Sequence, residues 1–152
     1  MATELVEPIF SAAPHAACPV GPLRAWFADP PGAVVQLSEA GEFTVDMARW
    51  LVGPGFELLL ERFQIDTGLS LVLDIREMTT REPVVRTVFM DKAREAASKF
   101  GLVAVIPPLR AKGVYLTALH AAGALVSAFG TKFEITSDLD DLLARYGIRP
   151  AS

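Results

Sequence analysis

Two kinds of hydrophobic pattern alternate along this chain from residue 23 onward. Short, nearly unbroken apolar runs predict buried strands, and longer segments with apolar residues every three or four positions predict helices. The opening segment 23–37 contains two strand-like runs on either side of DPPG at 29–32, which predicts an antiparallel hairpin. Three further strand-like runs follow, with the sequences LSLVLDI, LVAVI and KFEIT (residues 69–75, 102–106 and 132–136).

Helical periodicity fills the intervals between these runs. The first helix is expected to start near Val45 with Thr44 as its cap, and GPG at 53–55 must interrupt it or restart it as a second helix. A later helix covers about residues 109–129, and Ser137 caps the last one.

The helix after LVLDI has the clearest start signal. Thr79 and Glu82 form a capping-box pattern, and Pro83 follows at the first helical turn. Oppositely charged residues four positions apart are expected on its solvent side as Glu82/Arg86 and Glu95/Lys99.

The element order is therefore β-β-α-β-α-β-α-β-α. Alternating strands and helices predict an α/β domain with a mostly parallel central sheet of about five strands, an antiparallel N-terminal hairpin and about four helices. Residues 1–22 are rich in proline and alanine and are interpreted as an extended or mobile arm, 23–147 as the domain, and 148–152 as a tail.

Composition narrows the class of protein. The 152 residues are 51% hydrophobic with a net charge of −4. The chain lacks the excess of basic residues that is typical of nucleic-acid-binding proteins, so binding to nucleic acid is not predicted. With one cysteine, Cys18, no intramolecular disulfide is possible, and a reducing compartment is expected. The first residues, MATELVEPIF, lack the basic start and apolar stretch of a secretory signal, so a cytoplasmic protein is predicted.

The least ordinary feature is the segment 113–131, GVYLTALHAAGALVSAFGT, which contains no charged residue. Its alanines and glycines are weak drivers of membrane insertion, so no membrane span is predicted. The helix is instead covered by its own chain, or forms a homodimer or partner interface, or borders an apolar ligand pocket. The candidate residues for such a surface are Val114, Leu116, Leu119, Ala122, Leu125, Val126 and Phe129.

Polar candidates are scattered. Asp74 ends a buried strand, where parallel sheets bind ligands, and Arg76 and Arg110 are near it in the topology. The simpler interpretation is that Asp74 accepts hydrogen bonds from backbone amides of the next loop. Because no nucleophile motif, phosphate loop or metal-ligand spacing is present, neither an enzyme, a cofactor nor a metal site is predicted.

Three segments resemble those of a STAS domain, the fold of bacterial anti-sigma-factor antagonists. They are LRAWFADPPGAVVQLSEAGEFTVDMARWL, LVLDIREMTTREP and FEITSDLDDLLARYG, within a resemblance running from Leu23 to Tyr146. The resemblance implies a non-enzymatic module that binds a partner protein. Phosphorylatable members carry a serine in an Asp-Ser-Ser-Gly-like string, where this chain has Pro83 and Val84.

Two functional hypotheses follow. The first is a docking module in bacterial-type signalling, with Thr79 and Thr80 as candidate phosphoacceptors and a docking surface formed by Asp74, Arg76, Glu77, Arg81 and Glu82. For Thr79, helix capping is the simpler interpretation. The alternative is a carrier or sensor of a small apolar ligand such as a lipid, because some STAS-like relatives resemble lipid-carrier folds with an apolar pocket.

Overall fold

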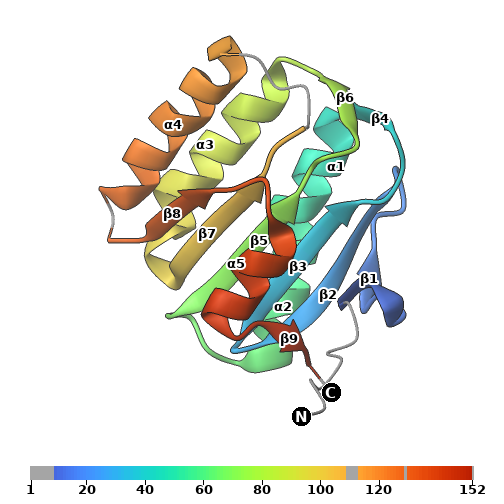
Figure 1. Cartoon of the computed structure of the whole chain (residues 1–152), viewed down its shortest axis with the longest axis vertical. Coiled ribbons are helices and arrows are strands. Elements are labelled where there is room, and N and C mark those ends of the chain that lie inside the picture. Colours follow the sequence, from blue (N-terminus) through green and yellow to red (C-terminus); the bar gives the residue numbers. More distant parts are fainter. Residues whose placement is uncertain (1–8, 109–112, 129, 152) are drawn as a thin grey trace.

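The computed structural model describes residues 9–108, 113–128 and 130–151, and within α4 it leaves out the side chains of 113–118 and 125. A central seven-stranded sheet organises the chain (Figure 1). Its strands are, in spatial order, β1 (Ala16–Ala17), β2 (Leu23–Asp29), β3 (Gly32–Leu37), β5 (Leu69–Asp74), β7 (Phe100–Ile106) and β8 (Lys132–Ile135), and β9 (Arg149–Pro150) also pairs with β2.

Strand direction changes once across this sheet. Pairing is antiparallel from β1 through β2 to β3, and parallel from β3 through β5 and β7 to β8. The predicted fold class is therefore confirmed, with a mostly parallel sheet and an antiparallel N-terminal hairpin.

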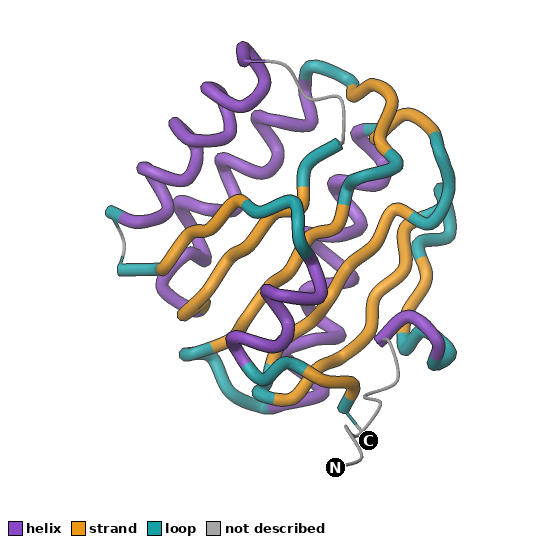
Figure 2. Tube along the Cα trace, in the orientation of Figure 1, coloured by secondary structure: helices purple, strands orange, loops and turns teal. Residues whose placement is uncertain are grey.

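Helices cover both faces of the sheet, as the tube in Figure 2 shows. One face carries α1 (Val45–Trp50), α2 (Phe56–Phe63), α3 (Val84–Ala96) and α4 (Gly113–Ser127), and the other carries α5 (Leu139–Tyr146). The π-helical segment Leu51–Gly55 joins α1 to α2, so GPG distorts the helix without ending it. As predicted, Thr44 caps α1, because its hydroxyl accepts a 3.2 Å hydrogen bond from the Met47 amide.

The start of α3 differs from the capping-box prediction. Thr79 and Thr80 lie in strand β6 (Met78–Arg81), which pairs in parallel with β4 (Gly41–Phe43), and α3 begins only after Pro83. The Glu82 carboxylate accepts a 3.1 Å hydrogen bond from the Val45 amide, so it caps the first turn of α1 and not that of α3. The prediction is wrong because a distant strand supplies backbone partners that hold this segment extended.

The last helix also has a different cap from the predicted one. Asp138, not Ser137, occupies the N-cap position of α5, where its carboxylate accepts a 3.0 Å hydrogen bond from the Asp141 amide. The Asp138 amide in turn donates to the Thr136 hydroxyl over 3.2 Å. The side chain that reaches the free amides of the first turn decides the cap, and the carboxylate does so here.

Residues 9–22, the described part of the predicted arm, pack against the sheet. Strand β1 pairs with β2, the Trp26 indole nitrogen donates to the Ala12 carbonyl over 2.8 Å, and the Phe27 amide donates to His15 Nδ1 over 2.9 Å. Cys18 is buried. This part is held against the sheet, with an extended stretch at β1, because its backbone groups find partners along the edge of β2. Residues 1–8 lie outside the described residues.

The sheet separates two apolar cores of different character. Alternate residues of a strand point to opposite faces, so on β5 Val72 and Asp74 point toward α5, whereas Leu71 and Leu73 point toward α1–α4. We call these two sides the α5 face and the cavity face.

Candidate ligand-binding site

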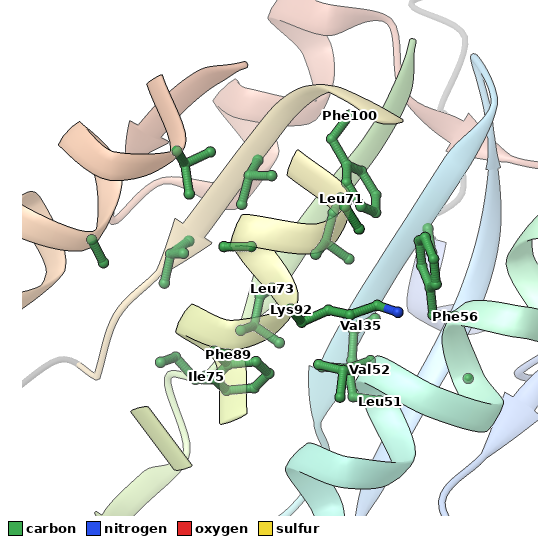
Figure 3. Close-up of a pocket in the computed structure, with 18 of the residues that line it drawn as sticks. Val35, Leu51, Val52, Phe56, Leu71, Leu73, Ile75, Phe89, Lys92 and Phe100 are labelled. Atoms are coloured by element: carbon green, nitrogen blue, oxygen red, sulfur yellow. The ribbon is translucent and has the colours of Figure 1, made fainter. Parts of the chain in front are cut away.

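An apolar cavity of about 250 Å³ lies between the sheet and helices α1–α4 (Figure 3). The stick view shows aliphatic and aromatic side chains from the sheet and from the covering helices converging on it. Small-molecule sites are typically apolar hollows of roughly 300–1,000 Å³ with few polar groups, so this one is slightly smaller than that range.

The floor of the cavity consists of central-strand side chains that are incompletely covered. Leu71 and Leu73 on β5 and Val103 on β7 keep part of their surface accessible, although they lie in the middle of the sheet. Val72, between the two leucines, is 0% exposed on the α5 face. The helices over the cavity face therefore do not fill the space above these side chains.

Small residues explain why the helices leave this space. The stripe of α3 that faces the sheet contains Ala93 and Ala96, followed by Ala97 at the end of the helix, and α4 contributes Ala122. A methyl group reaches only a short way from the helix toward the strands, so the two layers stay apart where these alanines lie.

Close approach of α4 to the sheet occurs on one side of the cavity. A Cβ atom on Gly123 would lie 2.3 Å from the Phe133 ring, so only glycine lets α4 pack on this β8 side chain. Leu119, Ala122 and Val126 of α4 line the cavity. The other candidate residues of this helix have side chains outside the described part of the structure, namely Val114, Leu116, Leu125 and Phe129.

The charged side chains that line the cavity, among the described residues, are all cations: Arg81, Arg86 and Lys92. The Lys92 ammonium lies 4.5 Å from the centroid of the Phe56 ring, and Figure 3 shows its side chain extending between α3 and the segment that carries Phe56. Its ion pair with Glu95 is 3.6 Å long, and the Glu95 side chain is 73% exposed. Such a long, solvated pair holds the ammonium only weakly.

The predicted polar site at Asp74 lies on the other face of the sheet and is an internal cluster. Asp74 is 2% exposed, and its carboxylate accepts hydrogen bonds from the Arg76 backbone amide at 3.2 Å and from the Arg76 guanidinium at 2.9 and 2.8 Å. Gln36 donates a further bond of 3.3 Å. The hydrogen bond with Asp74 raises the pKa of Arg76. The bond from the Arg76 amide agrees with the simpler interpretation of Asp74, and the two shorter bonds come from the Arg76 side chain. A role of Asp74 in binding stays a prediction, and Arg110 lies outside the described residues.

The predicted docking residues and phosphoacceptors lie in different local environments. Glu77, Thr79 and Thr80 are exposed, whereas Arg81 lines the cavity and Glu82 binds the start of α1. The Thr80 hydroxyl is 3.5 Å from the Glu42 carboxylate, a negative neighbour for any added phosphate. Phosphorylation at Thr79 or Thr80 stays a prediction.

Sequence reasoning missed Lys92 and the alanines of α3 as site residues. The available signal was the position of Lys92, three residues after Phe89 and four before Ala96, on the stripe that faces the sheet. In the part of the chain that the structure describes, no group of His, Cys, Asp and Glu side chains has the arrangement of a metal site. Nor does any described helix have the length and apolar character that a membrane span requires.

Comparison with known proteins identifies a fold. No protein-family model and no curated protein matches the chain. A solved structure that is similar is an uncharacterized protein of the DUF3478 family with a SpoIIAA-like fold, from Shewanella loihica PV-4. The similarity has a TM-score of 0.50 with 16% sequence identity, and it covers 74% of this chain and 81% of that one. The chain therefore has the SpoIIAA-like fold of anti-sigma-factor antagonists, which confirms the STAS-like resemblance at the level of the fold.

Proposed function

We propose that this STAS-like protein binds a small apolar ligand in the cavity on the cavity face and acts as its carrier or sensor. The observation that supports this most directly is the incomplete covering of Leu71, Leu73 and Val103 in the middle of the sheet. Apolar surface left uncovered in a core forfeits dispersion contacts, and a ligand of matching shape restores them. Neither catalysis nor a cofactor is part of the proposal.

The cavity volume sets the size of the ligand. An engineered apolar cavity of about 150 Å³ binds benzene, which has six non-hydrogen atoms. In proportion, about 250 Å³ accepts roughly ten non-hydrogen atoms. A nine-carbon alcohol, nonan-1-ol, is therefore a suitable uncharged probe.

The test is equilibrium binding of nonan-1-ol by calorimetry to the delipidated protein and two variants. Ala93→Phe places a benzene-sized ring in the cavity and is expected to weaken binding at least about tenfold. Ala144→Phe is the matched control, because Ala144 is exposed on α5, and it should leave binding unchanged. No binding to the wild type, or equal losses in both variants, would overturn the proposal.

A second candidate function is docking of a partner protein at the exposed end of the molecule around β6. Thr79 and Thr80 are exposed there, and the aliphatic side chain of Val84 at the start of α3 is 50% exposed. The STAS-like fold is compatible with such a module in bacterial-type signalling, with a cytoplasmic setting and a homodimer among the arrangements we expect. The test is whether a partner protein co-purifies with the wild type. Val84→Glu should abolish this co-purification, and Leu58→Glu, the control at another exposed aliphatic residue, should retain it.

A further inference from the structure

The charges around the cavity are of one sign, although the chain as a whole is acidic. The formal net charge is −4, yet Arg81, Arg86 and Lys92 line the cavity and no described acidic side chain does. The positive lining is therefore a local feature and does not follow from composition. A positive group next to apolar walls is well placed to attract an anion, because nearby low-dielectric material strengthens electrostatic interactions.

Lys92 is the cation whose position the structure defines best. Its ammonium is 4.5 Å from the Phe56 ring centroid, and its side chain is 24% exposed. The methylene stem covers apolar surface while the charged end reaches the boundary between cavity and solvent. Among the described residues, the carboxylate paired with this ammonium is that of the exposed Glu95 at 3.6 Å, and an exposed pair of that length contributes little.

We infer that the ligand is an anionic amphiphile, a medium-chain carboxylate of the fatty-acid type. Its hydrocarbon chain lies in the cavity and its carboxylate pairs with the Lys92 ammonium at the edge of the cavity beside Phe56. This inference rests on the proposed function and adds the charge of the head group and the residue that recognises it. A cationic head group would meet like charges along the lining, and a neutral one would leave the Lys92 ammonium with its long, solvated pair to Glu95 and no closer anion from the ligand.

The test compares three linear probes that each contain nine carbon atoms, namely nonanoate, nonan-1-ol and nonylammonium. Each is titrated into the full chain at pH 7 by calorimetry. Nonanoate is expected to bind about tenfold more tightly than the alcohol, the advantage of one charge-assisted hydrogen bond, and nonylammonium most weakly. High salt should reduce the advantage of nonanoate, because the pairing takes place at the boundary with solvent.

Two variants on the same helix assign the effect to Lys92. Lys92→Gln should weaken nonanoate about tenfold while leaving the alcohol within about twofold, and Lys92→Arg should retain most of the wild-type affinity. Arg94→Gln is the matched control, because Arg94 forms an ion pair of the same 3.6 Å length on α3 and does not line the cavity. Thermal melting of each variant confirms that it is folded.

The possible failures are distinguishable. If nonan-1-ol binds and nonanoate binds no more tightly, or if Arg94→Gln weakens nonanoate as much as Lys92→Gln does, the inference about the head group is wrong and the proposed function stands. If nonylammonium binds most tightly of the three probes, the inference about the head group is likewise wrong and the proposed function stands. If nonan-1-ol does not bind the wild type, the proposed function is wrong, and the inference that rests on it is wrong as well.

Discussion

The two faces of one sheet are packed to different degrees. On the α5 face, Val34, Val72 and Ala104 are each 0% exposed, and Leu142 of α5 is also 0% exposed. On the cavity face, Leu71, Leu73 and Val103 belong to the same central strands and keep accessible surface. Because these residues alternate along the same strands, the difference arises from the covering helices.

The covering side chains account for this contrast. Helix α5 places leucines on its face of the sheet, and Trp26 there packs edge-on against Phe10 with ring centroids 4.9 Å apart. Helices α3 and α4 place alanines and a glycine over the strands. A fully packed face contributes most to stability, whereas a face with a cavity gives up some stability and gains space for a ligand.

The largest expected effect comes from shortening a leucine on each face. Leu142→Ala should lower the free energy of unfolding by about 3–4 kcal/mol, because it opens a new cavity in a filled core. Leu73→Ala should cost clearly less, about 1–2 kcal/mol, because its side chain already borders empty space. Urea unfolding of the ligand-free variants measures both. Equal losses would mean that the two faces are packed alike.

Replacing an alanine by leucine on each face tests the same difference in packing, and here the larger loss of stability is expected where no space is available. Ala104→Leu on the α5 face should destabilise the protein by about 1–3 kcal/mol, because no space receives the added carbons. Ala93→Leu on the cavity face should leave stability within about 1 kcal/mol of the wild type or raise it, because the side chain enters the cavity. Thermal unfolding at one pH compares the two. A larger loss in Ala93→Leu would contradict the assignment of the empty face.

The smallest expected effect concerns the contact of α5 with β8. Arg145 forms an ion pair with Glu134, and the Tyr146 hydroxyl donates to the same carboxylate over 3.2 Å. The hydrogen bond from Arg145, followed by the charge of that residue, lowers the pKa of Glu134 below 4.5. A lowered pKa in the folded state means that the carboxylate stabilises the fold above pH 4.5 and that this contribution disappears as the pH falls through the lower value.

Glu134→Gln should therefore be slightly less stable than the wild type at neutral pH, and the difference should vanish in acid. Because the pair is at the surface and partly exposed, the effect stays small and weakens with salt. Urea unfolding at a series of pH values measures it, with Glu61→Gln on the exposed side of α2 as the control. A difference that grows as the pH falls would mean that the pair does not stabilise the folded state.

Local patterns were sufficient for most of the fold and failed where a distant segment supplied a partner. Continuous apolar runs located β5 and β7, and DPPG located the hairpin, because burial and turn chemistry act over a few residues. The capping box at Thr79 was wrong, since β4 pairs with that segment across the fold. Likewise, the Glu95 carboxylate lies against Lys92, not Lys99. Arg86 is exposed, as expected, and it also lines the cavity.

The sequence by itself therefore determined the class of fold, the order of its elements and an uncharged helix that needs apolar contacts. These properties follow from periodicity and composition, which act along the chain. Only the tertiary structure decided that α3 and α4 leave a cavity over Leu71 and Leu73, and that Lys92 lies over Phe56 at its edge. Whether helices fill the space above a sheet depends on side chains from separate elements meeting in three dimensions, and no local pattern records that meeting.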